Sequence, residues 1–118
     1  MTEPDGGGAH VRAGDVWWVD FDPVAGREQG SRRPAVVVAS EEYLASVTHL
    51  VLVVPVTTRD RGWPNHVPLD ERAGLGRPSF AMTEQPRAIS RERLLDAAGR
   101  VDEATTGSIR TWIHDFFA

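Results

Sequence analysis

The chain has no cysteine and no lysine, and it has no uninterrupted apolar run long enough to cross a bilayer. Without cysteine, it can form neither a disulfide framework nor a thiolate metal site, and it needs no oxidising compartment. Its first residues, MTEPDGGGAHVRAG, lack the basic end and apolar stretch of a secretory signal. We therefore expect a soluble, cytoplasmic protein that does not bind membranes.

Several sequence motifs for cofactor and metal chemistry are also absent. The chain contains no phosphate-binding GxxxxGKS/T loop, no dinucleotide-binding GxGxxG, no HExxH and no GxSxG. Its four histidines, His10, His49, His66 and His114, are scattered along the sequence. The sequence thus predicts no metal and no cofactor. His66 is the histidine most suited to a functional role, because it follows an arginine-rich loop.

Charge is distributed unevenly along the chain. The formal net charge is -4, and all 13 basic side chains are arginines. Residues 1–22 hold five acids against one arginine, whereas the 12 acids of residues 23–118 are balanced by 12 arginines. This composition counts against a non-specific nucleic-acid binder. A polyanion would have to be bound by a local cluster, such as Arg27, Arg32, Arg33, Arg59 and Arg61.

Length and local pattern indicate one small domain. We expect residues 1–13, which contain three consecutive glycines, to form a flexible tail, and residues 14–118 to form a single domain. Apolar and β-branched runs predict strands at residues 15–21, 35–39, 50–56, 65–69, 79–83 and 99–101. Short helical turns are expected at residues 41–44 and 91–94.

A longer helix is expected from Asp102 onward, because Ile109, Trp112, Ile113 and Phe116 recur at helical spacing. The fold class is therefore mainly β with α: a small, strongly curved antiparallel sheet or β-barrel with a C-terminal helix.

Two polar segments border the buried strands of this sheet. The loop GREQGSRRP precedes the second strand, and the third strand ends in PVTT. By itself the arginine pair has an ordinary explanation, as solvated charges that pair with Glu28, Glu41 or Glu42. In a curved sheet, however, a guanidinium and a threonine hydroxyl at adjacent strand ends offer several donors to one phosphate, and to the charge that builds on it during transfer.

These segments resemble a known family. GDVWWVDFDPVAGREQGSRRPAVVV, then VVPVTT, then FAMTEQPRAI and a C-terminal helix after GRVD are similar to the MazF/PemK-type toxins, sequence-specific endoribonucleases of bacterial toxin-antitoxin modules. The likeness runs in order from about Gly14 to the C-terminus. It implies an SH3-like barrel of the PemK/CcdB type and a homodimer. It also implies metal-independent cleavage of single-stranded RNA, with the ribose 2'-hydroxyl as nucleophile.

The resemblance also assigns roles to individual residues. Arg33, immediately before Pro34, and Thr57, at the end of the third strand, match the catalytic arginine and threonine of the family. Glu28 matches an acid that would orient Arg33 or transfer a proton. Because a guanidinium stays protonated, Arg33 is expected to stabilise charge rather than act as a general base. The residues expected to bind RNA are Gln29, Arg27, Arg32, Arg59, Arg61, Trp63, Gln85 and Arg87.

Two departures from the family pattern bear on RNA preference. Arg27 stands where serine commonly precedes the acid, and Pro86 replaces the usual apolar residue after Glu84-Gln85. Trp63 is equally compatible with stacking on an unpaired base and with covering the edge of the core.

Partners and alternative functions also follow from the resemblance. A cognate antitoxin is expected to insert an acidic segment into the dimer groove and to block RNA entry. Two other classes remain open: a CcdB-like toxin that binds and inhibits gyrase, and a non-enzymatic adaptor barrel. The presence of both Arg33 and Thr57 argues against the first, whereas the overall acidity favours the second.

Overall fold

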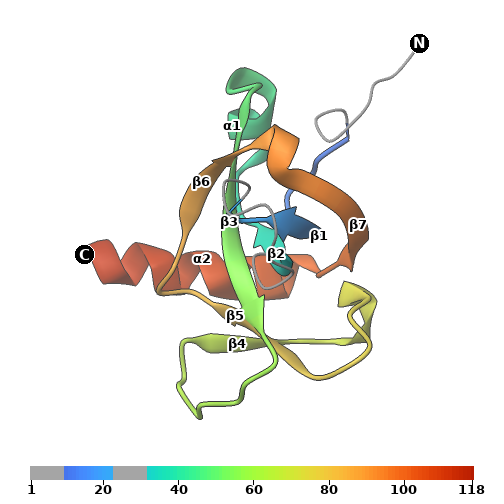
Figure 1. The fold of residues 1–118 in the computed structure, drawn as a ribbon. Coiled ribbons are helices and arrows are strands. Elements are labelled where there is room, and N and C mark those ends of the chain that lie inside the picture. Colours follow the sequence, from blue (N-terminus) through green and yellow to red (C-terminus); the bar gives the residue numbers. More distant parts are fainter. Residues whose placement is uncertain (1–9, 23–31) are drawn as a thin grey trace.

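The computed structural model describes residues 10–22 and 32–118 (Figure 1). The strands of this part of the chain are β1 (Asp15–Asp20), β2 (Arg32–Val37), β3 (Leu50–Thr57), β4 (His66–Leu69), β5 (Ser79–Met82), β6 (Arg87–Ser90) and β7 (Leu94–Arg100). The helices are α1 (Glu41–Ser46) and α2 (Glu103–Phe117), with short 3-10 turns η3 (Glu71–Ala73) and η4 (Arg91–Arg93).

The strands form one curved antiparallel sheet, as the sequence predicts. Their order is β4-β5-β3-β2-β1-β7, and β6 pairs with β3 outside this path. The described strands do not close into a barrel. In the described sheet the two end strands, β4 and β7, do not pair with each other, so the sheet stays open. In Figure 1, β6 and β7 curve around the upper half of the sheet, and α2 runs crosswise behind β3.

The central strands β2 and β3 are buried on both faces. Val37 and Val53 pack in one apolar cluster with Leu44 of α1, whereas their neighbours Val36 and Val54 pack in a second cluster with Ile109 of α2. Successive side chains of a strand point to opposite faces, so an uninterrupted valine run fills both clusters at once. The two helices thus cover opposite faces of the same strands.

Pro55 lies inside β3, although a proline in a sheet favours an edge strand or a strand end. On one side β3 pairs with β6 from Leu50 to Val53 and with β5 at Val56 and Thr57. Pro55 falls in the gap between these two partners, so its missing N–H group interrupts no hydrogen bond on that side. The strand therefore continues through the proline and ends at Thr57.

Two parts of the sheet differ from the sequence prediction. β6 was not expected, and β7 begins at Leu94, whereas only residues 99–101 were predicted as its strand. Most β7 side chains are exposed or half-buried, so the residues lack the apolar alternation that signals a strand. β7 is instead held by its pairing with β1, which is irregular at two places.

The predicted helices are confirmed, and their caps explain where they begin. Asp102 precedes α2, and its side chain accepts the backbone N–H of Thr105, while Ser40 caps α1 in the same way through Tyr43. No helix in residues 10–22 and 32–118 is long and apolar enough to span a membrane. Of the expected tail, residues 10–13 are described, and the Val11 side chain is buried in the first apolar cluster.

Candidate functional site

A cavity of about 320 Å³ lies where β2 begins and β3 ends. Its lining combines an aromatic ring, two guanidinium groups and three hydroxyl-bearing side chains, which are contributed by four separate segments. The lining residues are Trp18, Arg33, Pro34, Val56, Thr57, Thr58, Leu75, Arg77 and Ser79. Arg33 and Thr57, which the resemblance pairs, therefore lie at one site.

The pairing of the strands explains how Arg33 and Thr57 come together. β2 and β3 pair antiparallel with Ala35 opposite Pro55. Continuing this register by two residues places Arg33 opposite Thr57, with both side chains on the same face of the sheet. Arg33 itself pairs with Val19 of β1, so its backbone is fixed from the other side. The Arg33 side chain is exposed, and its cation is therefore available to a ligand.

The Thr57 hydroxyl is oriented by the loop that follows it. Its Oγ1 accepts a hydrogen bond from the backbone N–H of Arg59 at 3.1 Å. A hydroxyl has one donor and two acceptor positions, so this contact leaves the O–H proton available. Thr57 can thus donate to a phosphate oxygen that also contacts Arg33.

Arg77 is a cavity residue that the sequence analysis did not identify. It belongs to the segment between η3 and β5 and lines the cavity together with Arg33. Its carbonyl accepts the Ser79 hydroxyl at 2.9 Å. Both arginines precede a proline, Pro34 and Pro78, so a repeated Arg-Pro dipeptide was a signal that could have located it.

Arg32 lies beside the cavity and is engaged with two neighbours. Its guanidinium is 5.4 Å from the centre of the Trp18 ring and 3.4 Å from Asp96 Oδ2. Because both charged side chains are at least half exposed, this ion pair is weak. A phosphate could therefore compete with Asp96 for Arg32.

Three of the predicted site residues, Arg27, Glu28 and Gln29, lie outside the described residues. The catalytic role of Glu28, and the RNA-binding roles of Arg27 and Gln29, stay predictions.

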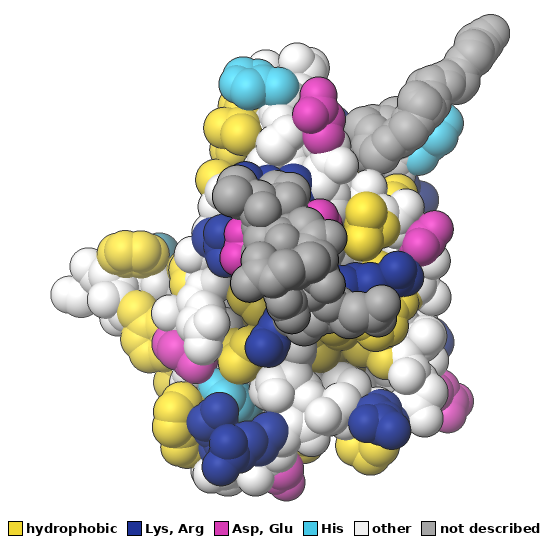
Figure 2. All heavy atoms as spheres, viewed as in Figure 1, with side chains coloured by type: hydrophobic (Ala, Val, Ile, Leu, Met, Phe, Trp, Pro, Cys, Tyr) yellow, Lys and Arg dark blue, Asp and Glu magenta, His cyan; other side chains and the backbone are white. Residues whose placement is uncertain are grey.

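The loop between β3 and β4 carries a second group of predicted RNA-binding residues. The Arg61 guanidinium lies 5.3 Å from the centre of the exposed Trp63 ring, and that ring lies 4.8 Å from the His66 ring. On the face shown in Figure 2, arginine and hydrophobic side chains adjoin a histidine at the lower left. Cationic and aromatic groups are thus gathered on one loop, next to the end of β3.

His66 is buried and bound to a carboxylate. Its Nε2 lies 3.1 Å from both carboxylate oxygens of Glu84, and Asn65 donates to the same carboxylate at 2.8 Å. Partial burial acts to raise the pKa of Glu84, but hydrogen bonds from His66, from the backbone and from Gln85 outweigh it and lower the pKa below its ordinary value. Glu84 is therefore ionised at neutral pH.

Gln85 and Arg87 follow Glu84 on the exposed turn into β6. The Gln85 amide donates to Glu84 at 3.3 Å and also contacts the Met82 sulfur, and the Arg87 guanidinium lies 4.9 Å from the centre of the Phe21 ring. Neither residue lines the cavity that holds Arg33.

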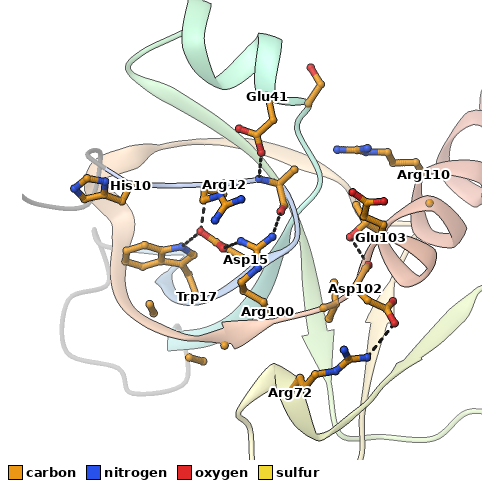
Figure 3. A pocket seen from close by; sticks show the side chains of 18 residues that line it. His10, Arg12, Asp15, Trp17, Glu41, Arg72, Arg100, Asp102, Glu103 and Arg110 are labelled. Carbon is orange, nitrogen blue, oxygen red and sulfur yellow. Dashed lines mark hydrogen bonds and ion pairs between the residues drawn. The ribbon is translucent and has the colours of Figure 1, made fainter.

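A larger hollow of about 1380 Å³ lies elsewhere, between the start of β1, β7 and the N-terminus of α2 (Figure 3). Three of its four carboxylates, those of Asp15, Glu41 and Asp102, are engaged within the protein. Asp15 accepts Arg100 at 2.6 Å and the Arg12 backbone N–H at 2.8 Å, Glu41 accepts the Ala13 N–H, and Asp102 accepts Arg72. None of the predicted site residues that the structure describes lines it. We therefore assign the candidate site to the smaller cavity, on its chemistry rather than its size.

The chain matches a protein-family model over most of its length. A family model described as "PemK-like, MazF-like toxin of type II toxin-antitoxin system" matches residues 12–117. The chain belongs to this family. The match includes all four segments that line the cavity at the start of β2 and the end of β3.

The chain is also similar to curated endoribonucleases and to solved MazF structures. It is 41% identical over 100 residues to "Endoribonuclease MazF9" of Mycobacterium tuberculosis, with 80% of this chain and 85% of that protein covered. It is 35% identical over 95 residues to "Endoribonuclease EndoA" of Bacillus subtilis, covering 79% and 82%.

Among solved structures, MazF from Deinococcus radiodurans superposes with a TM-score of 0.73 at 31% identity, covering 91% of this chain and 96% of that one. A MazE-MazF structure from the same organism superposes with a TM-score of 0.71 at 27% identity, covering 91% and 94%. The observed fold is therefore that of MazF proteins.

Within this MazF fold the cavity offers donors for an anion. Arg33 and Arg77 supply planar guanidinium forks that suit phosphate oxygens, and Thr57 supplies an oriented hydroxyl. In residues 10–22 and 32–118 no three histidine, aspartate or glutamate side chains form a group suited to hold a metal ion.

Proposed function

We propose that this protein is an endoribonuclease toxin that cleaves single-stranded RNA at the cavity between the ends of β2 and β3. The observation that carries the proposal is the joint placement of Arg33 and Thr57 in that cavity, at positions that the strand register sets opposite each other. The family match and the endoribonuclease names of the curated relatives support it.

The proposed reaction is an attack of the ribose 2'-oxygen on the adjacent phosphorus. The bond from phosphorus to the 5'-oxygen breaks, so the upstream fragment carries a 2',3'-cyclic phosphate and the downstream fragment a 5'-hydroxyl. One proton leaves the 2'-hydroxyl and one reaches the departing 5'-oxygen. This chemistry needs hydrogen-bond donors around the phosphate and no metal ion.

Arg33 and Thr57 act on the charge that develops in this step. The Arg33 fork binds two phosphate oxygens, and its permanent charge stabilises the negative charge of the transition state. The Thr57 hydroxyl, held by the Arg59 N–H, adds a preorganised neutral donor. Glu28 is the proposed proton-transfer or orienting group.

The proposal also covers partners. MazE-MazF structures are known for Deinococcus radiodurans, and we propose that a cognate antitoxin likewise binds this protein and neutralises it. Carboxylates of an acidic antitoxin segment would compete with RNA phosphates for the same arginines. We further propose a homodimer that acts in the cytoplasm, where its RNA substrates are.

A cleavage assay with EDTA present tests the function. Wild-type protein is incubated with a pool of single-stranded RNAs, and the 5' ends of the products are sequenced to find the cleaved sequence. An oligonucleotide with 2'-deoxyribose at the cleaved position should resist cleavage. Mass spectrometry should find the cyclic phosphate.

Arg33→Ala tests the mechanism in the same assay. Loss of the charge donor should lower kcat about 100- to 1000-fold, as is typical for removal of one transition-state donor. Arg12→Ala, which removes an arginine outside the cavity, is the control and should cleave like wild type. Cleavage by Arg33→Ala at the wild-type rate would contradict the mechanism alone. If the wild-type protein leaves RNA intact but arrests the growth of cells that express it, the nuclease function is contradicted, and a toxin that acts by binding a protein is favoured.

A further inference from the structure

Trp63 combines exposure with a fixed position. Its side chain is 47% exposed, although it belongs to one of the most apolar residue types. The Trp63 carbonyl accepts the backbone N–H of His66 at 3.1 Å, and the two rings are in tilted contact. The ring is thus held at the surface by the start of β4.

A hydrogen-bond cluster anchors this arrangement to the turn between β5 and β6. His66 and Asn65 both bind the Glu84 carboxylate. The Thr83 hydroxyl donates to the Asn65 carbonyl at 2.8 Å. The His66 side chain is only 2% exposed, so the ring that contacts Trp63 is itself held in place by burial. The tryptophan therefore loses little conformational freedom when a flat ligand stacks on it.

The loop that carries Trp63 starts at the candidate active site. Thr57 pairs with Phe80 of β5, and His66 pairs with Met82, two residues further along the same strand. Two residues of strand correspond to about 7 Å along the sheet, and β3 and β4 lie on opposite sides of β5, about 9.6 Å apart across it, so Thr57 and His66 are about 12 Å apart. A nucleotide near the scissile phosphate can therefore reach Trp63 while the phosphate stays at Arg33 and Thr57.

Charge and aromatic surface coincide on this loop. The Arg61 guanidinium lies next to the Trp63 ring, where it can neutralise a phosphate that flanks a stacked base. A stacking ring with an adjacent cation is the usual device for binding single-stranded nucleic acid. A ring that only covered the core would need neither the exposure nor the neighbouring cation.

We propose that Trp63 is a base-stacking residue for a nucleotide close to the scissile phosphate, and that this subsite binds any base. The inference rests on the proposed endoribonuclease function. The Glu84 carboxylate already accepts hydrogen bonds from His66, Asn65 and Gln85, so it has little capacity left to read a base edge. Stacking itself tolerates every base. The subsite contributes affinity and alignment, whereas base identity is read elsewhere.

The test is an abasic scan of the cleaved oligonucleotide. In wild-type protein, an abasic nucleotide at one position near the cleaved bond should lower kcat/KM about 5- to 150-fold, whereas exchange of one base for another there should change it little. Trp63→Leu should lower kcat/KM for the intact oligonucleotide by a similar factor. For this variant, the abasic nucleotide should cause no further decrease in kcat/KM. Trp63→Phe, which keeps an aromatic face, should retain most of the activity.

Phe117→Leu is the matched control, because it removes a different exposed aromatic ring and should cleave like wild type. Thermal unfolding of Trp63→Leu checks whether the variant is folded. The inference is overturned if folded Trp63→Leu cleaves like wild type, or if it keeps the full abasic penalty, and in both cases the nuclease function stands. A wild type that cleaves no RNA overturns the proposed function and this inference with it.

Discussion

Thr57 shows how a single hydroxyl is prepared for chemistry. The Arg59 N–H occupies one acceptor position of its oxygen, so the O–H bond is free to turn toward the cavity. Threonines are common in strands, and only the position of half-buried Thr57 at the end of β3, next to Arg33, suits it to the proposed function.

We predict that Thr57→Val lowers kcat about 100- to 1000-fold, because the isosteric side chain cannot donate to the transition state. KM should change little, since Arg33 and the neighbouring arginines still bind the ground-state phosphate. Thr57→Ser keeps the hydroxyl and should retain most of the activity. Steady-state cleavage of a defined oligonucleotide measures both constants, and equal kcat for the valine and serine variants would contradict the role.

Glu84 gives the protein a pH-dependent contribution to stability. Its pKa is lower in the folded state than its ordinary value of about 4.3, so the unfolded chain binds the proton more tightly. The stabilisation is therefore fully present above that ordinary value and is lost as the pH falls through the folded-state pKa.

We expect Glu84→Gln to have a lower free energy of unfolding than wild type at pH 6, and the difference to shrink as the pH falls below about 4.3. Urea unfolding at a series of pH values measures this. Glu92→Gln, at an exposed acid of η4 for which no such contact with a histidine is seen, should show a smaller change. If the difference in unfolding free energy between Glu84→Gln and wild type stays constant with pH, Glu84 is not the source of the pH-dependent stability.

Close packing between η3 and β7 depends on glycine. Gly74 ends η3 with a φ of 77°, a left-handed conformation that side chains disfavour. A Cβ atom there would lie 2.0 Å from the carbonyl oxygen of Ala98 in β7. This contact would force the two segments apart.

We predict that Gly74→Ala lowers the free energy of unfolding by at least about 2 kcal/mol, from backbone strain and the steric clash together. Gly76→Ala is the control, because Gly76 has a φ of 80° but open space around its Cβ position. It should therefore show only the cost of the left-handed backbone. Chemical denaturation of both variants gives the difference, and equal losses would mean that the approach of β7 contributes nothing.

Elements with a strong local pattern were predictable from the sequence. The valine runs of β2 and β3 and the helical spacing of Ile109, Trp112 and Phe116 need no distant information. β6 and most of β7 were missed because their structure depends on pairing with β3 and β1, which local sequence does not record.

Some residues of the candidate site were likewise predictable from local sequence, whereas others come together only in the fold. The Arg-Pro dipeptide and the end of the third strand identified Arg33 and Thr57. Arg77 joins them only because the chain folds back before β5, and the binding of His66 to Glu84 joins residues 18 positions apart. The repeated Arg-Pro dipeptide marks Arg77 in the sequence, but local patterns do not show that Arg77 lies beside Arg33 or that His66 binds Glu84.

In the molecule as a whole, the arginines near the candidate site are exposed, whereas other arginines bind backbone carbonyls of the protein itself. The net charge is -4, yet the cavity and the loop after β3 carry exposed arginines, namely Arg33, Arg77, Arg59 and Arg61. Other arginines are structural: Arg91 donates to the carbonyls of Leu44, Val47 and Leu50, and Arg110 donates to those of Val38 and Ala39. RNA is thus expected to bind through a few local contacts rather than through a basic surface.

This predicts a shallow salt dependence. For single strands the logarithm of the binding constant falls by about 0.7 per neutralised phosphate for each logarithmic unit of salt. Three to five arginine contacts should thus give a slope of about -2 to -3.5 for a non-cleavable oligonucleotide. Titrations at several salt concentrations measure it. A much steeper slope would indicate that RNA binds over a wider surface, and Arg61→Ala should make the slope shallower by about 0.7.

Strand β3 connects the parts of the sheet on either side of Pro55. It pairs with β2 along one edge and with both β6 and β5 along the other. Neither half of the protein can detach while this strand keeps its partners, and losing them dismantles both apolar clusters together. We therefore expect no partly opened form in which Thr57 stays in place while the rest of the sheet comes apart, and the placement of Thr57 beside Arg33 requires the intact sheet.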